Sequence, residues 1–417
     1  MRTSRRDLLS MGAATAALAA VVPSRLFAED AASGLKPMTG DITPISRAEY
    51  LARIAKARAL MSLQGIGALL IEPGASMVYF TGVDWWRSER LTAAILPREG
   101  DIAIVTPHFE EPSVRESLKV PAEVRVWNED EDPLATVAGV LRDRKVTAPV
   151  AVEETVRFFA VDALRRAMPR VDIRNGAPVV RGCRMMKSSA ELALMQKAAD
   201  ITIAAYRNTA PRIETGMTPK DIGAMMDAAH AALGAAPEFA LILLGEASAY
   251  PHGSGQPQAV REGAVVLMDC GCTVEGYQSD ISRTFVSGAV TPEQRKVWQQ
   301  VRDGQQIAIE TARVGLPAGR VDDAVRAQYV KWGYGPGYKL PGLPHRTGHG
   351  IGLDGHEPVN LVHGEQTILA TGMCFSDEPG IYLPGKFGIR LEDCFHMSAE
   401  KPIWFSTPPP SLDKPFG

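Results

Sequence analysis

The C-terminal half of this chain carries side chains that could bind divalent metal ions. They are four carboxylates and one imidazole, each in or beside a short apolar run: Asp269, Asp280, His349, Glu378 and Glu392. A shell made mostly of oxygen favours hard cations such as Mn, with Fe, Co or Zn as alternatives. Paired ions of this kind activate water in hydrolases. The sequence therefore predicts a two-metal site, provided that the fold brings these residues together.

Strand periodicity brings the two aspartates to one face. Residues 265–272 form an apolar run that predicts a buried strand, and residues 277–286 predict its return after a turn. Partners across a hairpin have a constant sum of residue numbers. A turn centred on residues 274–275 sets Asp280 opposite Asp269, and a turn centred one residue later sets it diagonally. Both alternatives place the two carboxylates on the same face of the sheet.

The two glutamates show the same arrangement. Residues 373–378 and 388–393 predict a second hairpin. Gly385 lies midway between Glu378 and Glu392, so a loop of odd length makes the two glutamates partners. Four inward carboxylates repel one another, and burying unpaired charge is costly. Two divalent cations would supply the counter-charge.

Two histidines precede the glutamates at an ambiguous spacing. His345 and His349 are four residues apart, which on a helix would suggest a zinc motif. Three nearby glycines disfavour a helix: Gly348, Gly350 and Gly352. We therefore expect a loop that enters a strand.

Five motifs surround these residues. They are Asp269-Cys270-Gly271, Ser279-Asp280-Ile281-Ser282-Arg283-Thr284-Phe285, His345-Arg346-Thr347-Gly348-His349-Gly350-Ile351-Gly352-Leu353-Asp354, Asp377-Glu378-Pro379-Gly380-Ile381-Tyr382 and Gly388-Ile389-Arg390-Leu391-Glu392-Asp393. Together they resemble the pita-bread metallopeptidases, in the branch of prolidase, aminopeptidase P and creatinase. The resemblance covers residues 45–400 and fills every metal position of the family.

The resemblance implies a fold and a reaction. The fold is α/β: a C-terminal pita-bread domain, which is a curved antiparallel sheet with outer helices and a pseudo-twofold repeat, follows a creatinase-like α/β N-terminal domain. The reaction is metal-dependent hydrolysis of the peptide bond before proline, by an Xaa-Pro dipeptidase or an Xaa-Pro aminopeptidase. The substrate would be a small peptide with proline at the second position, and two divalent ions, Mn above all, would be the cofactors.

The resemblance also implies roles for individual residues. His349 would be the lone nitrogen ligand, and Glu378 both a metal ligand and the base that takes the proton of the attacking water. His252 would hold the carbonyl oxygen as it becomes an oxyanion, and His356 would contact substrate and pass a proton to the departing proline nitrogen. The other candidates for contacting substrate or orienting the site are His345, Tyr382 and Arg390.

A pair of tryptophans in the N-terminal half could contribute to the active site of a second subunit. In dimeric relatives the loop after the run at residues 79–82 reaches the neighbour's active site. We therefore expect a homodimer in which Trp86 or Arg87 lines the partner's pocket. The alternative is that Trp85 and Trp86 are ordinary core residues.

Two other functions fit parts of the pattern. One is a non-peptidase enzyme on the same scaffold, either a creatinase-like C–N hydrolase or a metal-dependent lyase of a small sulfonium compound. The complete ligand set argues against a metal-free creatinase but not against such a lyase. The other is a binding protein with a retired active site, which the retention of all five ligands with His252 and His356 disfavours. The sequence has no phosphate loop, dinucleotide fingerprint or Gly-x-Ser-x-Gly nucleophile motif.

Length and composition are typical of a large enzyme with two domains. The chain has 417 residues, more than one core usually holds. Its net charge of -3, with both signs intermixed, gives no electrostatic footprint for nucleic acid. No run beyond the N-terminus approaches the ~20 apolar residues of a membrane span, so we expect no integral membrane protein.

The sequence predicts five parts. Residues 1–28 read as a twin-arginine signal peptide, 29–45 as a flexible linker, 46–181 as the N-terminal domain, 182–400 as the catalytic domain and 401–417 as an irregular tail. In the N-terminal domain we expect a helix over 48–64 and strands over 67–71, 76–80, 91–96 and 102–105. In the catalytic domain we expect, twice, two helices followed by ligand-bearing strands, with helix starts near Ser188, Thr218 and Thr291.

The N-terminus predicts export. Arg5 and Arg6 precede a mild apolar stretch, residues 11–22, and Ala28 offers a small residue for cleavage. A periplasmic or secreted location would follow. The alternative is a basic N-terminus that has no targeting function. The five cysteines are an odd number in apolar contexts, so we interpret them as buried packing residues rather than a disulfide framework.

Overall fold

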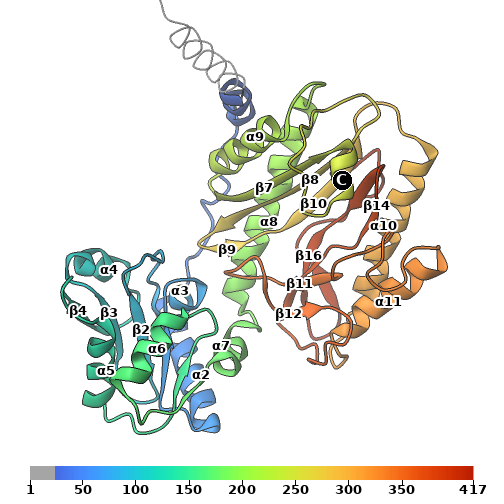
Figure 1. Cartoon of the computed structure of the whole chain (residues 1–417). Helices are drawn as coiled ribbons and strands as arrows, with labels where there is room; N and C mark the ends of the chain where they lie inside the picture. Colours follow the sequence, from blue (N-terminus) through green and yellow to red (C-terminus); the bar gives the residue numbers. More distant parts are fainter. Residues whose placement is uncertain (1–23, 417) are drawn as a thin grey trace, which may run out of the picture. The chain divides into compact units, whose positions relative to one another are not determined.

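The computed structural model describes residues 24–416, which divide into two compact units (Figure 1). One unit is Pro44–Met186, and the other joins residues 24–43 to the chain from Lys187 onward. The predicted export signal at Arg5 and Arg6 lies outside the described residues. Among the helices of residues 24–416, none is both long and apolar enough to cross a bilayer.

The unit Pro44–Met186 is built on a six-stranded mixed sheet in the order β4-β3-β2-β1-β5-β6. Its strands are β1 (Ala68–Ile71), β2 (Ala93–Pro97), β3 (Ile102–Pro107), β4 (Ala122–Trp127), β5 (Val150–Val152) and β6 (Ile173–Asn175). Its helices are α2 (Arg47–Gln64), α3 (Ala75–Thr81), α4 (Glu111–Ser117), α5 (Pro133–Asp143), α6 (Phe158–Ala167) and α7 (Ala177–Arg184). Every residue of β1, β2 and β3 is buried, as in a sheet covered on both faces. The predicted mixed α/β architecture is confirmed.

One predicted strand is wrong. Residues 76–80, expected as a strand, lie in the helix α3. The run is buried at most positions, and a continuous apolar run does not distinguish a buried strand from a short buried helix. The helix ends at Gly82, whose φ of 76° is left-handed and whose N–H donates to the carbonyl of Val78. Gly82 is the feature of the sequence that could have indicated a helix ending here.

The second unit repeats one order of elements. Its first half contains α8 (Ser189–Thr209), α9 (Pro219–Ala232), β7 (Ala236–Leu244), β8 (Val265–Val274), β9 (Tyr277–Gln278) and β10 (Ile281–Val286). Its second half contains α10 (Pro292–Thr311), α11 (Gly319–Lys331), β11 (Gly348–Gly350), β12 (Glu357–Leu361), β13 (Cys374–Asp377), β14 (Gly380–Leu383), β15 (Phe387–Arg390), β16 (Asp393–Met397) and β17 (Pro402–Trp404). Capping boxes open α8, α9 and α10 at Ser188, Thr218 and Thr291, as predicted.

The strands of the two halves meet at the middle of this unit. β7, β8 and β10 form one antiparallel sheet, and β12-β11-β13-β16-β17 form another, with the hairpin β14–β15 beside them. The backbone N–H of Glu392 donates to the carbonyl of Ser282 at 3.1 Å and so joins the two halves. Helix α8 packs on β8, α9 packs on β7, and α10 packs on β13, β14 and β15. The predicted pita-bread arrangement is confirmed.

Two parts of the predicted domain division differ from the structure: the linker at residues 29–45 and the boundary at residue 181. Residues 29–43 are not a free linker but pack on the catalytic unit, where Met38 N–H donates to the carbonyl of Leu233 at 2.8 Å. Asp41 forms an ion pair with Lys197 of α8 at 2.8 Å. The boundary expected at residue 181 falls inside α7, which packs on α2 and keeps the N-terminal unit intact to Met186.

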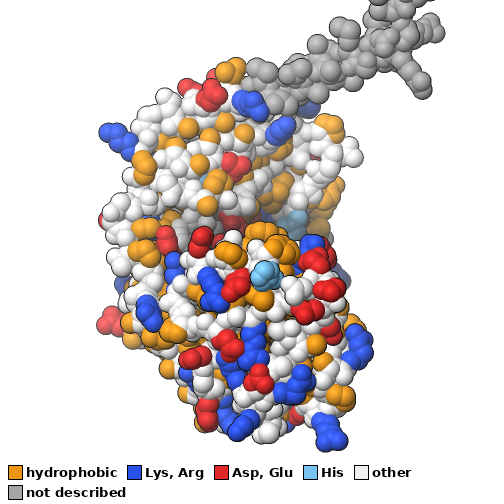
Figure 2. All heavy atoms as spheres, turned by 90° about the vertical axis from the view of Figure 1, so that its left-hand side faces the viewer, with side chains coloured by type: hydrophobic (Ala, Val, Ile, Leu, Met, Phe, Trp, Pro, Cys, Tyr) orange, Lys and Arg blue, Asp and Glu red, His pale blue; other side chains and the backbone are white. Residues whose placement is uncertain are grey.

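The tail also has more structure than predicted. β17 extends the sheet by pairing with β16, and Phe405 is buried beside it. The backbone N–H of Phe405 donates to the carbonyl of Cys394 at 2.9 Å. The proline run that suggested an irregular segment begins only after this strand. On the face drawn in Figure 2, acidic and basic side chains are intermixed, without a basic stripe.

Candidate active site

The first two candidate ligands come from the hairpin of β8 and β10. Asp269 pairs with Ser282 across the ladder, so Asp280 lies diagonally from Asp269. The turn is centred between Glu275 and Gly276, which have φ of 50° and 80°. A two-residue turn of this hand requires positive φ at both positions. The second of the two predicted registers is therefore correct, and ligand atoms of both aspartates lie within 4.8 Å of each other.

The two glutamates come from the second hairpin. Asp377 pairs with Asp393 at the end of β13 and the start of β16, and β14 and β15 continue the same register. Glu378 and Glu392 occupy the position between these ladders, with the same sum of residue numbers. Their predicted partnership is confirmed.

His349 is prepared to act as a nitrogen ligand. It lies in β11, so the predicted loop entering a strand is also confirmed. Its Nδ1–H donates to the carbonyl of Gly350 at 3.0 Å, which leaves the lone pair of Nε2 free. Nε2 lies 3.4 Å from Glu378 Oε1 and 3.6 Å from Asp280 Oδ2.

The carboxylates form a cage in which three oxygens are buried without a hydrogen-bond partner among the described residues. Asp269 Oδ1, Asp280 Oδ1 and Glu392 Oε1 have no partner within residues 24–416. Burial, reinforced by the neighbouring carboxylates, raises the pKa of Asp280 and of Glu392 well above the ordinary range. Burial also raises the pKa of Glu378 to about 7, against the opposing field of a nearby arginine. These acids can be ionised together only with cations beside them, so the residues fit a pair of divalent metals.

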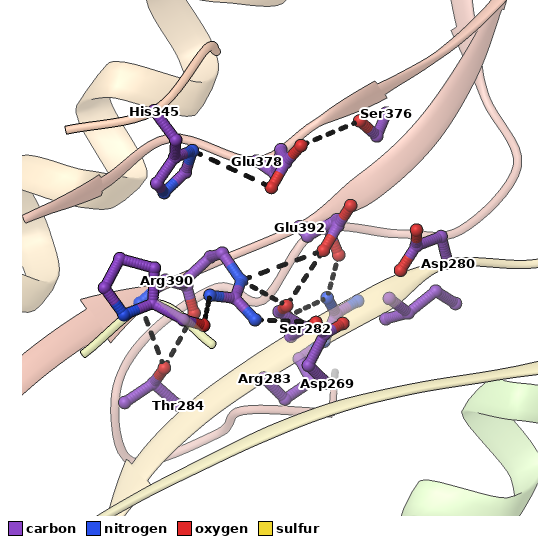
Figure 3. A network of polar contacts seen from close by, with 12 residues as sticks. Asp269, Asp280, Ser282, Arg283, Thr284, His345, Ser376, Glu378, Arg390 and Glu392 are labelled. Atoms are coloured by element: carbon purple, nitrogen blue, oxygen red, sulfur yellow. Dashed lines mark hydrogen bonds and ion pairs between the residues drawn. The ribbon is translucent and has the colours of Figure 1, made fainter. Parts of the chain in front are cut away.

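Arg390 binds the outer side of this cage. Its Nη2 donates to Asp269 Oδ2 at 2.6 Å, and its Nε donates to Ser282 Oγ at 2.9 Å (Figure 3). Ser282 Oγ in turn donates to Glu392 Oε2 at 2.9 Å. Sequence reasoning assigned no role to Ser282. The available signal was its position two residues after Asp280, which places both on one face of the strand.

A chain of hydrogen bonds continues from Arg390 to His345. Arg390 Nη1 donates to the hydroxyl of Tyr382 at 3.1 Å, and this hydroxyl donates to His345 Nε2 at 2.9 Å. His345 Nδ1–H donates to the carbonyl of Arg346 at 2.8 Å. Burial lowers the pKa of His345 to about 3, so the ring is neutral. Both ring nitrogens are used by protein groups, and His345 thereby orients Tyr382.

A cavity of about 560 Å³ opens over the cage. His252 and His356, two predicted catalytic residues, line it and are exposed. His356 Nδ1 accepts a hydrogen bond from Arg346 Nη2 at 3.0 Å, so Nε2 carries the proton of the neutral ring. The ring of His356 lies 4.0 Å from that of His349, centroid to centroid. The cavity therefore brings a proton donor beside the predicted metal ligand.

Trp86 belongs to the other unit of the chain. It is 65% exposed and stacks on Trp85 with a centroid distance of 4.6 Å, so it is not a core residue. Arg87 Nε donates to the carbonyl of Pro73 at 2.7 Å, which holds that side chain on its own unit. All residues that line the cavity lie between Pro251 and Glu392. The role of Trp86 in a partner's pocket stays a prediction.

Comparison with known proteins identifies the family. Residues 193–399 match the model of metallopeptidase family M24, and residues 53–186 match that of the creatinase/prolidase N-terminal domain. The probable dipeptidase PepE of Mycobacterium tuberculosis is 33% identical over 82% of this chain and 91% of its own length. The chain belongs to metallopeptidase family M24. This M24 enzyme is thus a hydrolase that depends on divalent metal ions.

Further relatives agree with this assignment. The Xaa-Pro dipeptidase of Lactobacillus helveticus is 32% identical to the M24 enzyme described here, over 76% of this chain and 86% of its own length. The crystal structure of dipeptidase PepE from Mycobacterium ulcerans matches with a TM-score of 0.81 at 31% identity, covering 89% of this chain and 99% of that one. The prolidase of Thermococcus sibiricus matches with a TM-score of 0.79 at 29% identity, covering 86% and 97%.

Proposed function

We propose that this M24 enzyme is an exopeptidase that hydrolyses the Xaa-Pro bond of small peptides. The observation that carries the proposal is the cage itself: three carboxylate oxygens are buried without partners among residues 24–416, and their residues line a cavity of about 560 Å³ together with His349, whose Nε2 is free. Relatives named as Xaa-Pro dipeptidases, each matched over most of its length, support the choice of bond.

The residues that would hold two divalent ions are Asp269, Asp280, His349, Glu378 and Glu392. When bound, the ions would acidify a water molecule and polarise the scissile carbonyl. We propose Mn as the native metal because the donor set is mostly oxygen, with Fe, Co and Zn as alternatives.

The chain's own groups would then handle the protons. Glu378, which lines the cavity beside the other ligands, would take the proton of the attacking water. His356, which lines the cavity, would relay to the departing proline nitrogen the proton that Glu378 has taken, so that both groups return to their starting protonation states. His252, at the wall of the cavity, would donate to the carbonyl oxygen as negative charge develops there.

Two further features belong to the proposal. A homodimer is supported by the exposed Trp86, which would line the partner's cavity. Export by the twin-arginine route is supported by Arg5 and Arg6 in front of the apolar stretch at residues 11–22.

Turnover of defined substrates tests the reaction. The purified enzyme is stripped of metal, reconstituted with Mn, and assayed with Ala-Pro, Ala-Ala, creatine and a small sulfonium compound. We expect cleavage of Ala-Pro at least ~10-fold faster than of Ala-Ala, and no turnover of the other two compounds. Turnover of creatine or of the sulfonium compound without Ala-Pro cleavage would show that the enzyme is a C–N hydrolase or a lyase rather than a peptidase.

A further inference from the structure

The side chains of the cage form overlapping groups of three. In each group, every residue offers a ligand atom within 4.8 Å of the others. One group joins the two aspartates to Glu392, and another joins His349 and Glu378 to the same glutamate. A third combines Asp280, His349 and His356. The first two groups can each hold one ion, and we call them the aspartate site and the histidine site.

Asp322, in the first turn of α11, accepts four hydrogen bonds although it does not line the cavity. Its Oδ1 accepts from the N–H of Thr347 at 3.1 Å and from the hydroxyl of Thr347 at 2.7 Å. Its Oδ2 accepts from Arg326 Nε at 2.6 Å and from the N–H of His363 at 2.9 Å. The side chain is fully buried, so it depends on these donors in place of water. One carboxylate therefore holds both chain ends of the β11–β12 pair to α11.

Thr347 connects this carboxylate to the histidine site. Its carbonyl accepts from the N–H of Glu378 at 2.8 Å, and it precedes His349 by two residues. Ser376 links the same two ligands directly. Its hydroxyl accepts from the N–H of His349 at 3.0 Å and donates to Glu378 Oε1 at 3.5 Å (Figure 3). Asp322 therefore holds the backbone that leads into both ligands.

Arg326 keeps the carboxylate of Asp322 in one position. Its Nη1 donates to the carbonyls of Gly337 and Leu343, both at 2.8 Å, while its Nε donates to Asp322. The guanidinium also stacks on the ring of Tyr338, with 4.0 Å from Cζ to the ring centroid. A planar guanidinium with several fixed acceptors is preorganised, so Asp322 faces a rigid partner.

The aspartate site has a separate support. Arg390 donates to Asp269 Oδ2 at 2.6 Å, whereas the four donors to Asp322 belong to α11 or to residues 347–363. The two sites share Glu392, which accepts a hydrogen bond from Ser282 of the first hairpin. A change at Asp322 should therefore reach the histidine site and leave the aspartate site unchanged.

We propose that Asp322 is a positioning residue for the histidine site and determines how tightly this site binds its ion. The inference rests on the pair of ions in the proposed function, and it adds a residue that touches neither substrate nor metal. Groups behind the ligands of a metal site orient those ligands, and losing one lowers metal affinity by ~10–100-fold. In Asp322→Asn, an amide N–H faces the N–H donors of Arg326 or Thr347, so the four bonds cannot all be kept.

Binding of Mn to the metal-free protein tests the proposal without turnover. The wild type, Asp322→Asn and the control Glu72→Gln are titrated with Mn against a chelator of known affinity. Glu72 is matched because it is a buried carboxylate, in the other unit, that accepts from the guanidinium and the backbone N–H of Arg157. We expect one of two ions to bind ~10–100-fold more weakly in Asp322→Asn, and both to bind as in the wild type in Glu72→Gln.

Double variants identify the weakened ion. In a His349→Ala background, which breaks the histidine site, Asp322→Asn should have no further effect on the remaining ion. In an Asp280→Asn background, which breaks the aspartate site, Asp322→Asn should weaken the remaining ion by ~10–100-fold. The reverse pattern, or equal weakening of both ions in Asp322→Asn alone, overturns the inference.

Melting curves of the same metal-free proteins separate positioning from stability. If Asp322 is only structural, Asp322→Asn melts at a lower temperature but binds both ions as the wild type does, which overturns the inference. If Asp322→Asn does not fold, Thr347→Val decides, because it removes one of the four donors and keeps the backbone N–H. We expect it to weaken one ion by ~3–10-fold, the scale of one hydrogen bond, and unchanged affinities in the folded variant overturn the inference.

The wild type shows whether the inference and the proposed function fail together. A wild type that binds two ions but does not cleave Ala-Pro overturns the proposed function and leaves the role of Asp322 to the titrations. A wild type that binds fewer than two ions overturns the pair of ions, and the inference with it.

Discussion

Arg390 donates to one oxygen of the Asp269 carboxylate at 2.6 Å, while the other oxygen, Oδ1, is buried without a partner among residues 24–416. One carboxylate oxygen is thus held by the protein and the other is left for a metal. Groups of this kind, behind the ligands, orient them and tune their affinity.

Replacing Arg390 should therefore weaken metal binding. Arg390→Lys retains a positive charge but cannot reach Asp269, Ser282 and Tyr382 together, so we expect metal affinity to fall by ~10–100-fold. Competition with a chelator of known affinity measures the change. Arg295→Lys, on the exposed pair with Asp413, is the matched control. Unchanged affinity in Arg390→Lys would show that Asp269 needs no such support.

Neutral replacements of two buried acids should separate metal content from stability. In Asp280→Asn and Glu392→Gln we expect the loss of at least one metal per chain, together with activity. The metal-free variants should melt at or above the temperature of the metal-free wild type near neutral pH, because burial and mutual repulsion disfavour the ionised acids. Elemental analysis and melting curves on the same preparations check both. Two retained metals in either variant would contradict the ligand assignment.

The two exposed histidines should affect turnover without affecting metal content. His252→Ala and His356→Ala should each lower kcat/KM for an Xaa-Pro substrate by ~10²-fold, the usual scale for a lost oxyanion donor or general acid. Metal content should stay near two ions per chain. His363→Ala, an exposed histidine paired with Asp323, serves as the control. Near-wild-type turnover in both variants would remove these histidines from the mechanism.

A histidine remote from the cavity should govern acid stability. His230 is fully buried beside Thr202, and burial lowers its pKa to about 4 from an ordinary value of 6.5. The unfolded chain therefore binds the proton first, and stability is lost as pH falls from 6.5 to 4, by ~3 kcal/mol in total. His230→Gln should flatten the profile of unfolding free energy in this window. An equally steep profile in the variant would assign the acid sensitivity to other groups.

The proposed export by the twin-arginine route can be tested at its two arginines. Replacing both Arg5 and Arg6 with Lys should retain the protein in the cytoplasm if they form a twin-arginine signal. Cell fractionation, with an unaltered periplasmic marker in the same cells, measures the distribution. An undiminished periplasmic yield would assign another role to this terminus.

The hairpins that carry the ligands could be predicted because their register follows from parity. The position of Gly385 made Glu378 and Glu392 partners, and alternation along β8 and β10 restricted Asp269 and Asp280 to one face. The choice between two turn centres could not be made from the numbers alone. It depended on the backbone at Glu275 and Gly276, which takes positive φ at both positions.

Other features depend on contacts that no local pattern reveals. The guanidinium of Arg390 donates to residues of four segments, namely Pro251, Asp269, Ser282 and Tyr382. The acceptor of the Ser282 hydroxyl is 110 positions away in the chain. Residues 76–80 form a helix because a buried apolar run satisfies either structure and the surrounding fold decides. The segment at residues 29–43 lacks strong periodicity, yet it docks by a backbone hydrogen bond and two ion pairs.

Chemical labelling of the five cysteines can measure how often the folded molecule opens. All are buried and free, and burial raises the pKa of Cys183 to about 11 and of Cys374 to about 12, so thiolate is scarce in the folded state. Three others, Cys270, Cys272 and Cys394, lie in β8 and β16, the strands that present or flank Asp269 and Glu392. Alkylation of these thiols requires the ligand strands to part. The rate of labelling with and without metal would therefore measure how strongly the ions hold the two halves of the sheet closed.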